Sequence, residues 1–354
     1  MDKFKRDLIL LNMVRDLGCI RIKALLDAFK TPEAVFNVSV SELTRVKGIG
    51  RITAESIKNA KSVYDIDKEV RLIEKEGVQV KAIYEEDYPL NLKQIYAPPV
   101  LLYVKGKLDK ADTEAVAIVG SRRCTQYGIR TAQRLAKELS SYGITVISGL
   151  ARGIDTAAHK GSVSVNGKTI AVLGNGLSSV YPRENKELAD QIVKNGALIS
   201  EFPMDMPPCK ENFPQRNRII SGLSKGVVVI EAAEKSGALI TADFALNEGR
   251  DVFAVPGPAG QATSKGTNRL IKEGAKLIED AKDILSDMGV FFEESGRRKE
   301  LIFSDPFEKS IYGAISDEPV DIDTIVETHS LNTKQAKTAL LSLEVRGVIK
   351  QLPG

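Results

Sequence analysis

Short apolar runs alternate with amphipathic stretches between residues 115 and 288 of the chain. This alternation is typical of a parallel sheet whose two faces are covered by helices. The runs predict strands at residues 115–119, 144–147, 169–173, 197–200, 227–230 and 252–255. The stretches between them predict helices that include residues 127–141, 184–194 and 239–248. We therefore expect an α/β domain built on a Rossmann-like, doubly wound and mainly parallel sheet.

Residues 1–62 show a different pattern, in which short helical segments are joined by glycine turns. In the clearest example, residues 43–57, Gly48 and Gly50 form a turn between two helices and leave N–H groups where a phosphate can bind. A weaker copy at residues 10–26 has a single turn glycine. The pair resembles the tandem helix-hairpin-helix modules that contact DNA backbones without reading sequence. An ordinary helical bundle, whose turn only closes a hairpin, is the alternative.

The segment between these two regions contains a charged helical stretch at residues 64–76 and several prolines between residues 88 and 104. We expect this segment to be a connector that belongs to the second domain. That domain then spans residues 63–288, with its core at residues 115–288.

The end of the chain predicts a third domain after a linker. Residues 289–304 have no helical or strand period. Residues 305–354 contain patterns for helices at 307–315 and 334–346 and for a terminal strand at 348–352. This order is typical of a winged-helix-like domain. Its presumptive recognition helix is only modestly basic, so contact with DNA and contact with protein both remain open.

The composition is that of a folded, soluble protein with several domains. Of the 354 residues, 43% are hydrophobic and 27% are charged. The net charge of +3 does not by itself indicate nucleic-acid binding, because such binding depends on where Lys and Arg cluster.

Cysteine and histidine are too few and too scattered for a metal site. The three cysteines, Cys19, Cys124 and Cys209, have no CxxC spacing, and the only histidines are His159 and His329. No stretch approaches the ~20 apolar residues of a membrane helix, and the first residues lack the core of a signal peptide. We expect a cytoplasmic protein without a metal, a cofactor or a membrane contact.

Unusual residues gather where the predicted strands end. Ligands of open parallel sheets bind beyond the carboxyl ends of the strands, because loops and helix N-termini with unpaired N–H groups converge there. Glycines let the backbone approach an anion, and guanidinium groups bind phosphate oxygens with two donors. The turns after the first four strands supply Gly120, Ser121 and Arg122, then Gly149 and Arg152, then Gly174, and finally Phe213, Arg216, Asn217 and Arg218. We expect one anion-binding groove. For any single turn, a chain reversal with a solvated arginine is the alternative.

Two glycine patterns fall short of nucleotide-binding motifs. Residues 167–169 look like the end of a P-loop, but Ser162 stands where the first glycine belongs, and the segment leads into a strand. Residues 174–179 lack the third glycine of a dinucleotide fingerprint and do not lead directly into a helix. ATP hydrolysis and nicotinamide binding are therefore disfavoured.

Asp155, Thr156 and His159 contain the residue types of an acid, a nucleophile and a base. We expect Asp155 to be a helix N-cap instead, and His159 to be a partly buried polar residue one turn later. No catalytic residue is predicted.

Longer motifs resemble the bacterial DNA-processing protein A family (DprA/Smf type) over roughly residues 85–285. The motifs that carry the resemblance are residues 119–122, 148–159, 213–222, 236–241, 248–257 and 270–275. The resemblance implies a protein that is not an enzyme. Such a protein binds and protects single-stranded DNA, largely independently of sequence, and loads the RecA recombinase onto it during natural transformation.

The resemblance also implies partners and binding residues. It implies a homodimer formed through the Rossmann-like domain, and it adds the single-strand binding protein as a further candidate partner. Two family binding residues map onto Arg122 and Lys168, which we expect to neutralise phosphates together. Four more residues match motif positions that we expect on the same edge, namely Arg152, Arg216, Asn217 and Arg218.

Two other classes of function remain as alternatives. Related Rossmann-like proteins bind nucleotides and cleave their N-glycosidic bonds with a Gly-Gly-x-Gly-Thr-x-x-Glu loop, but the comparable residues 235–243 lack those glycines and that glutamate. A transcription regulator that uses the C-terminal domain would bind particular duplex sites tightly.

Overall fold

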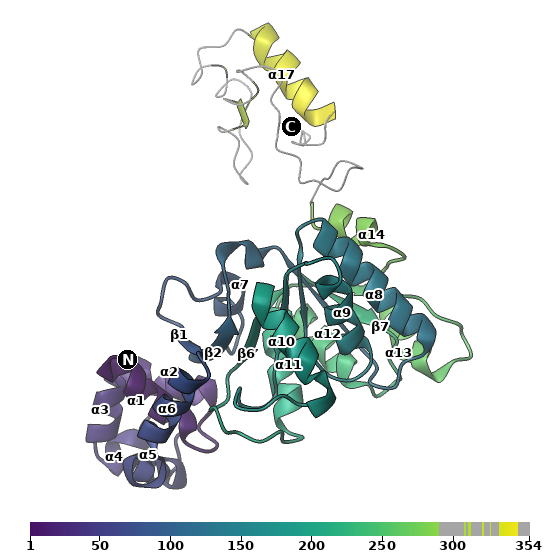
Figure 1. Ribbon diagram of the computed structural model, residues 1–354. Coiled ribbons are helices and arrows are strands. Elements are labelled where there is room, and N and C mark those ends of the chain that lie inside the picture. Colours follow the sequence, from purple (N-terminus) through teal and green to yellow (C-terminus); the bar gives the residue numbers. More distant parts are fainter. Residues whose placement is uncertain (290–307, 309–310, 313–320, 322–325, 327–332, 346–354) are drawn as a thin grey trace. The chain divides into compact units, whose positions relative to one another are not determined.

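A computed structural model describes residues 1–289, 308, 311–312, 321, 326 and 333–345 of the chain (Figure 1). The chain forms two compact units, residues 1–288 and residues 289–354. Within the described residues, no helix is both long enough and apolar enough to cross a membrane.

The first unit begins with a domain of short helices. These are α1 (Lys3–Met13), α2 (Gly18–Phe29), α3 (Pro32–Asn37), α4 (Val40–Leu43), α5 (Arg51–Val63) and α6 (Ile66–Lys75). Asp2, Thr31, Ser39 and Asp65 each accept a hydrogen bond from a first-turn N–H, which fixes where four of these helices start.

Two helical hairpins lie side by side in this domain, as the sequence predicted. Gly18, with φ 66°, begins the second helix of one hairpin, and Gly48, with φ 85°, lies in the turn before α5 of the other. A Cβ atom on Gly48 would lie 3.8 Å from the side chain of Arg21. The two turns are therefore neighbours.

In residues 1–288, nine strands form one sheet. They are β1 (Gln79–Ala82), β2 (Leu101–Gly106), β3 (Ala115–Gly120), β4 (Thr145–Ser148), β5 (Thr169–Val172), β6 (Ala197–Ser200), β7 (Gly226–Ile230), β8 (Asp251–Ala254) and β9 (Lys276–Leu277). Their order is β1-β2-β6-β5-β4-β3-β7-β8-β9, and only the β1–β2 and β2–β6 pairs are antiparallel. The predicted strands and the mainly parallel, Rossmann-like sheet are confirmed.

The supposed connector contributes two strands that the sequence did not reveal. β1 pairs with β2, and β2 pairs with β6 through Tyr103 and Ser200. This pairing joins segments about a hundred residues apart in the chain, so local patterning could not predict it. The prolines near β2 lie outside the strand itself and do not interrupt its ladder.

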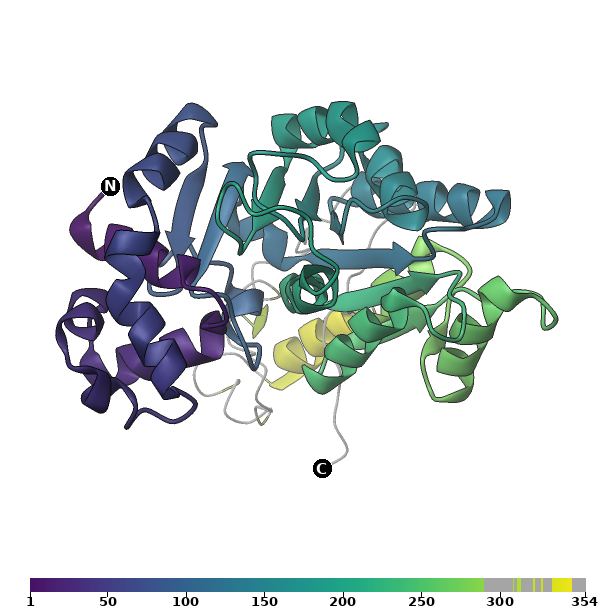
Figure 2. The same ribbon diagram turned by 90° about the horizontal axis from the view of Figure 1, so that it is seen from below.

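Helices cover both faces of the sheet (Figure 2). On one face lie α8 (Gln126–Ser141), α9 (Ile154–Val163) and α10 (Lys186–Asn195). On the other face lie α7 (Leu90–Lys93), α11 (Asn212–Leu223), α12 (Gly237–Asn247) and α13 (Lys265–Lys272). The sheet is therefore doubly wound.

The apolar core of the helical domain continues into the sheet domain. Leu8, Leu25 and Ile57 of the helical domain belong to the same buried cluster as Tyr103 of β2 and Met204 of the loop after β6. All five side chains are fully buried. Burial of this kind stabilises the docking of the two domains, because apolar surface is removed from water.

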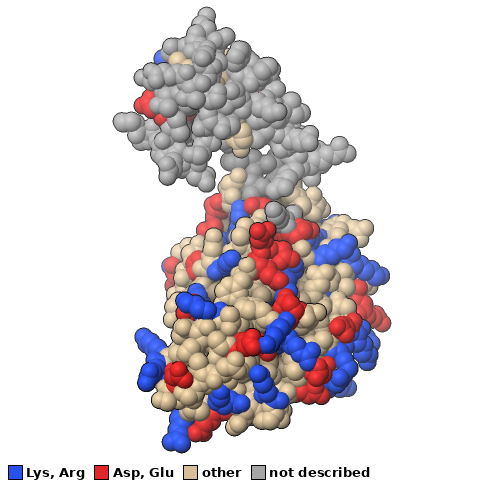
Figure 3. Space-filling model, turned by 90° about the vertical axis from the view of Figure 1, so that its left-hand side faces the viewer, with Lys and Arg blue, Asp and Glu red and all other residues tan. Residues whose placement is uncertain are grey.

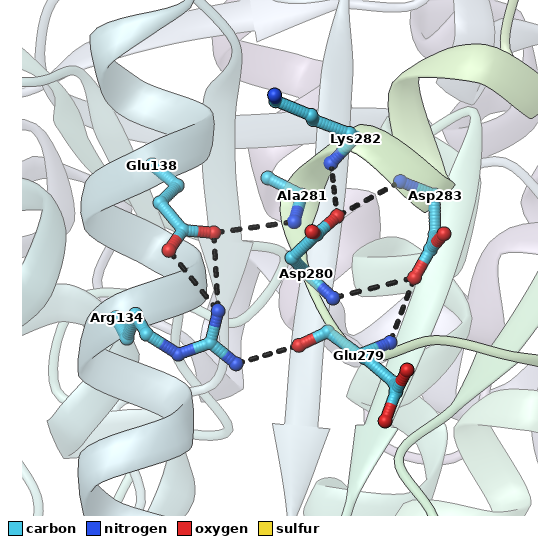
Figure 4. Close-up of polar contacts among 7 residues, drawn as sticks. All are labelled: Arg134, Glu138, Glu279, Asp280, Ala281, Lys282 and Asp283. Carbon is cyan, nitrogen blue, oxygen red and sulfur yellow. Dashed lines mark hydrogen bonds and ion pairs between the residues drawn. The ribbon is translucent and has the colours of Figure 1, made fainter.

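The first unit ends at α14 (Ala281–Asp287), which α8 holds in place (Figure 4). The Arg134 guanidinium donates to the Glu279 carbonyl (2.6 Å), and the Ala281 N–H donates to Glu138 Oε2 (3.2 Å). Asp280 caps the helix from its N-terminal end. These contacts fix the last element before the second unit.

The second unit contains α17 (Thr333–Val345), which corresponds to the predicted recognition helix. Ala336, Ala339 and Leu343 of this helix form a small buried cluster with Ile311. Apart from Gly289, the expected linker at residues 289–304 lies outside the described residues. Most of the helix expected at 307–315 and the whole terminal strand at 348–352 also lie outside them.

Candidate nucleic-acid interface

Loops that follow the parallel strands surround a pocket of about 780 Å³ at the carboxyl edge of the sheet. Its lining mixes polar side chains with aromatic and aliphatic ones, including Ser121, Arg122, Asn217, Tyr181, Phe213 and Ile220. Both α11 and α12 begin at this edge, so their first N–H groups add a positive potential. The turns predicted from the sequence thus meet around one hollow.

The turn after β3 requires a glycine at its first position. A Cβ atom on Gly120 would lie 1.9 Å from the carbonyl oxygen of Ile230, which excludes any other residue. The Ser121 N–H donates to the Glu231 carbonyl (2.7 Å), and the Thr125 N–H donates to the Glu231 carboxylate (2.7 Å). Glu231 therefore fixes the backbone of the turn on both sides of Arg122.

Arg122 is exposed, and its guanidinium carbon lies 5.1 Å from the centre of the Phe213 ring. Among the residues that the structure describes, no carboxylate pairs with this guanidinium. A cation–π contact at an exposed site contributes only about 0.5–1 kcal/mol. Arg122 can therefore leave the ring for a stronger, charge-assisted bond to an anion.

The Phe213 ring is positioned by two neighbours from the loop after β5. A Cβ atom on Gly174 would lie 2.7 Å from the ring, so this glycine makes room for the aromatic side chain. The Tyr181 ring lies beside it, with 5.7 Å between the ring centres. The expectation that Gly174 itself holds a phosphate is thus replaced by a packing role.

Arg216 lies beneath the pocket and is 3% exposed. It donates hydrogen bonds to the carbonyl oxygens of Val172 and of Gly149, the latter at 2.8 Å. Burial lowers its pKa to about 10, although nearby Asp155 opposes that change. Arg216 ties the β4 and β5 turns to α11 through these bonds. It also forms part of the pocket lining, so the DNA contact expected from the sequence stays a prediction.

Arg218 is also buried and forms two hydrogen bonds of 2.7 Å with the Glu201 carboxylate. Burial lowers its pKa, but the charge of Glu201 more than offsets that effect and raises the pKa above its ordinary value. The guanidinium is therefore always charged and always paired. These bonds occupy both terminal nitrogens of Arg218, which argues against the contact with DNA expected from the sequence.

Two further predicted residues lie at the edge in different states. The Asn217 side chain lines the pocket, donates to the Gly237 carbonyl (3.2 Å) and accepts from Arg216 Nε (3.3 Å). Arg152 is exposed, but its guanidinium pairs with Glu184. Asn217 is available to a ligand in the pocket, whereas Arg152 would first have to leave its carboxylate.

Lys168 lies at the opposite edge of the sheet from Arg122. It precedes β5, and its ammonium group pairs with Asp109 (2.6 Å) and Asp112 (2.8 Å). The expectation that Lys168 and Arg122 neutralise one strand of DNA together is therefore wrong. β3 and β5 run in the same direction, because both are parallel to β4. The amino end of β5 and the carboxyl end of β3 therefore lie at opposite edges of the sheet.

The structure adds cations that the sequence argument missed. Arg123 and Lys210 line the pocket, and Arg183 is exposed on the loop that follows β5. No ion pair holds any of the three within the described part of the chain. Arg183 could have been found by extending the rule for strand ends a few residues further, because it follows the turn at Gly174.

Asp155 and His159 are structural residues. The N-cap of α9 is Gly153, and the Asp155 carboxylate instead accepts hydrogen bonds from the N–H groups of Gly149 (3.2 Å) and Ala151 (3.3 Å). Burial raises the pKa of Asp155, against the charge of Arg216. His159 is fully buried, not partly buried, and burial lowers its pKa to about 3.

The helical domain presents a mixed surface (Figure 3). On the face drawn there, Lys and Arg are interspersed with Asp and Glu. Lys47 stands in the turn before α5 without a partner in the described residues, but Arg51 pairs with Glu55. Neither alternative for the hairpins, DNA contact or simple packing, is decided by these contacts.

The chain combines a Rossmann-like sheet with a pocket, helix N-termini and arginines that have no ion pair in the described residues, all at the carboxyl edge. This combination is typical of proteins that bind phosphate-bearing ligands. Comparison with protein families is more specific. The chain belongs to the DNA recombination-mediator protein A family, whose model matches residues 79–289. The DprA winged helix domain matches residues 303–354, and a SAM-like helix-hairpin-helix tandem matches residues 8–60.

Individual relatives agree with this assignment. The chain is 42% identical to Protein Smf of Escherichia coli over 277 residues, which cover 76% of this chain and 74% of that protein. The crystal structure of DNA processing protein A from Streptococcus pneumoniae is 36% identical, covers 81% of this chain and 99% of its own, and has a TM-score of 0.71. A structure of DNA processing protein A from Helicobacter pylori, which concerns the single-stranded DNA binding mode of that protein, is 32% identical and has a TM-score of 0.54. The match covers 59% of this chain and 95% of that one.

Proposed function

We propose that this protein binds single-stranded DNA at the carboxyl edge of its sheet. The observation that carries the proposal is the exposed guanidinium of Arg122, which lies over an aromatic ring at a pocket of about 780 Å³ and has no carboxylate partner in the described residues. Phosphates would bind the side chains of Arg122, Arg123 and Lys210.

The pocket favours a single strand over a duplex. Its lining includes the rings of Tyr181 and Phe213 and the aliphatic side chain of Ile220, against which a base can pack. Bases in a duplex are stacked and cannot enter such a pocket, whereas bases of a single strand can. Because every base has an aromatic face and every nucleotide has a phosphate, we expect little dependence on sequence.

Membership of the family supports a proposal for the biological role. We propose that the protein acts in the cytoplasm, protects single-stranded DNA during natural transformation and loads RecA onto it, with the single-strand binding protein as a further partner. We also propose a homodimer. Its support is apolar side chains left in solvent, at Ile240 and Leu246 of α12 and at Leu277 of the edge strand β9.

The decisive experiment is a titration of the full-length protein with labelled single-stranded and double-stranded oligonucleotides at several salt concentrations. We expect tighter binding to the single strand and an affinity that falls steeply with salt, because counterions are released when phosphates are neutralised. Equal or tighter binding of duplex DNA would contradict the proposal.

An enzyme that binds or hydrolyses nucleotides is the second candidate, since the pocket lies where Rossmann-like proteins place nucleotides. The one carboxylate in its lining is Asp155, which is buried and occupied by backbone N–H groups. No lining residue is therefore free to act as a carboxylate catalyst. Incubation with nucleoside monophosphates tests this candidate, and release of free base at enzyme-like rates would support it.

A further inference from the structure

The loop between β6 and α11, residues 201–211, leads directly to Phe213, and the helical domain holds its first half. The Asn12 side chain of α1 donates to the Glu201 carbonyl (2.9 Å), and Lys68 of α6 pairs with Asp205 (2.7 Å). The Met204 N–H donates to the carboxylate of Glu69 in α6 (2.8 Å). Three side chains of one domain thus fix a loop of the other.

Glu69 is the buried member of this set, with 4% of its surface exposed. Burial raises its pKa, while the Met204 N–H and the Tyr103 hydroxyl both favour its charged form. A buried carboxylate is costly unless it is hydrogen-bonded. The hydrogen bond from the Met204 N–H offsets part of this cost and links the two domains at Glu69.

The Met204 backbone passes the constraint to the pocket. Its carbonyl accepts a hydrogen bond from the Ser178 N–H (3.0 Å), and the Met206 carbonyl accepts one from the Gly176 N–H (2.9 Å). A Cβ atom on Gly176 would lie 2.0 Å from the Pro203 carbonyl oxygen, so the two loops are in close contact. The loop at residues 174–179 begins with the glycine against which the Phe213 ring packs.

We propose that Glu69 is a positioning residue for the DNA site, through which the helical domain holds the two loops that adjoin Phe213 of α11. The path runs from Glu69 to Met204, from there to residues 176–178, and then to the Phe213 ring that supports Arg122. The expected effect of Glu69 on DNA binding rests on the proposed function. The expected effect of Glu69 on the order of the two loops is independent of it.

The test compares Glu69→Ala, Glu69→Gln and Arg71→Ala in the full-length protein. Arg71 lies on the same helix and its side chain is 66% exposed. Within the described residues its one ion-pair partner is Asp65, at 3.7 Å, so its variant is a matched control. Amide hydrogen exchange is followed by mass spectrometry in peptides that cover residues 174–179 and 201–213, and single-strand affinity is measured in parallel.

Loss of the acceptor in Glu69→Ala should speed exchange in these two segments, leave β3 and β4 unchanged, and weaken single-strand binding about fivefold, the value of one hydrogen bond. Glu69→Gln should keep the exchange rates and the single-strand affinity of the wild type, since its amide oxygen can accept a hydrogen bond from the Met204 N–H. Arg71→Ala should match the wild type. If Glu69→Ala does not fold, Asn12→Ala, which frees the Glu201 carbonyl, should speed exchange in the 201–213 segment.

Unchanged exchange and affinity in Glu69→Ala would overturn the inference, and so would faster exchange throughout the protein, which would indicate a merely structural role. Failure of the wild type to bind single-stranded DNA would instead overturn the proposed function. In that case, faster exchange in the two loop segments of Glu69→Ala, together with wild-type exchange in Glu69→Gln, would still support the role of Glu69 in holding the loops.

Discussion

The two edges of the sheet use their cations differently. At the amino edge, Lys168 pairs with Asp109 and Asp112, and Lys225, just before β7, pairs with Glu114. At the carboxyl edge, Arg122, Arg123 and Arg183 are exposed and have no carboxylate partner in the described residues. Helix N-termini make the carboxyl edge positive already, so unpaired arginines there are unfavourable until an anion binds. The difference shows that pairing, more than the count of cations, marks the ligand site.

The comparison predicts the largest effect where a carboxyl-edge arginine is buried and paired. Arg218→Ala should lower the free energy of unfolding by about 3–5 kcal/mol, because it leaves Glu201 as a buried, unpaired charge. Denaturant titration measures this loss. Lys225→Ala, which removes a partly exposed pair, is the control and should cost less than about 1 kcal/mol. Similar losses in both variants would remove the distinction between buried and exposed pairs.

The next effect separates the two edges by function. Arg122→Ala should weaken single-strand binding by about 1.5–3 kcal/mol, the value of a hydrogen bond to a charged group, and reduce the salt slope by about 0.7. Its thermal unfolding midpoint should stay nearly unchanged, because the residue is exposed. Lys168→Ala should bind single-stranded DNA like the wild type. A loss of affinity in Lys168→Ala would show that the DNA also reaches the amino edge.

A third prediction concerns buried polar groups near the amino edge, where His159 is hydrogen-bonded to Thr169 (2.7 Å). Burial lowers the His159 pKa from 6.5 to about 3. Between these two pH values, His159 binds a proton in the unfolded chain but not in the folded chain. Stability from this group is therefore lost as the pH falls from 6.5 toward 3, at up to about 1.4 kcal/mol per pH unit. Unfolding of wild type and His159→Gln across this range should show the shallower slope in the variant. Parallel slopes would contradict the assignment.

The smallest effect compares Arg152, in the turn after β4, with Arg183, on the loop after β5. Arg183 has no ion pair within the described residues, whereas Arg152 pairs with Glu184. Arg183→Ala should weaken single-strand binding by about 1 kcal/mol, and Arg152→Ala by less, because its charge is already partly neutralised. The same oligonucleotide titration measures both. The reverse order would mean that DNA displaces Glu184 on binding.

Much of the sheet was predictable, because each parallel strand is a short apolar run bounded by polar or turn residues. β1 and β2 were not predicted, and the pairing that places them in the sheet joins β2 to β6, which lies far away in the chain. The position of Lys168 was available from residue order alone. It stands immediately before Thr169, the first residue of β5, and therefore belongs to the amino end.

The sequence by itself determined which turns meet at the carboxyl edge, because the parallel direction of the strands follows from the alternation of strands and helices. It also determined that Arg122 follows a glycine turn. Only the tertiary structure decided which arginines are free. The partner of Arg218 is Glu201, and the constraint on Met204 comes from Glu69, 135 residues earlier in the chain. Pairing and burial depend on distances between side chains that are remote in sequence, and those distances exist only once the chain has folded.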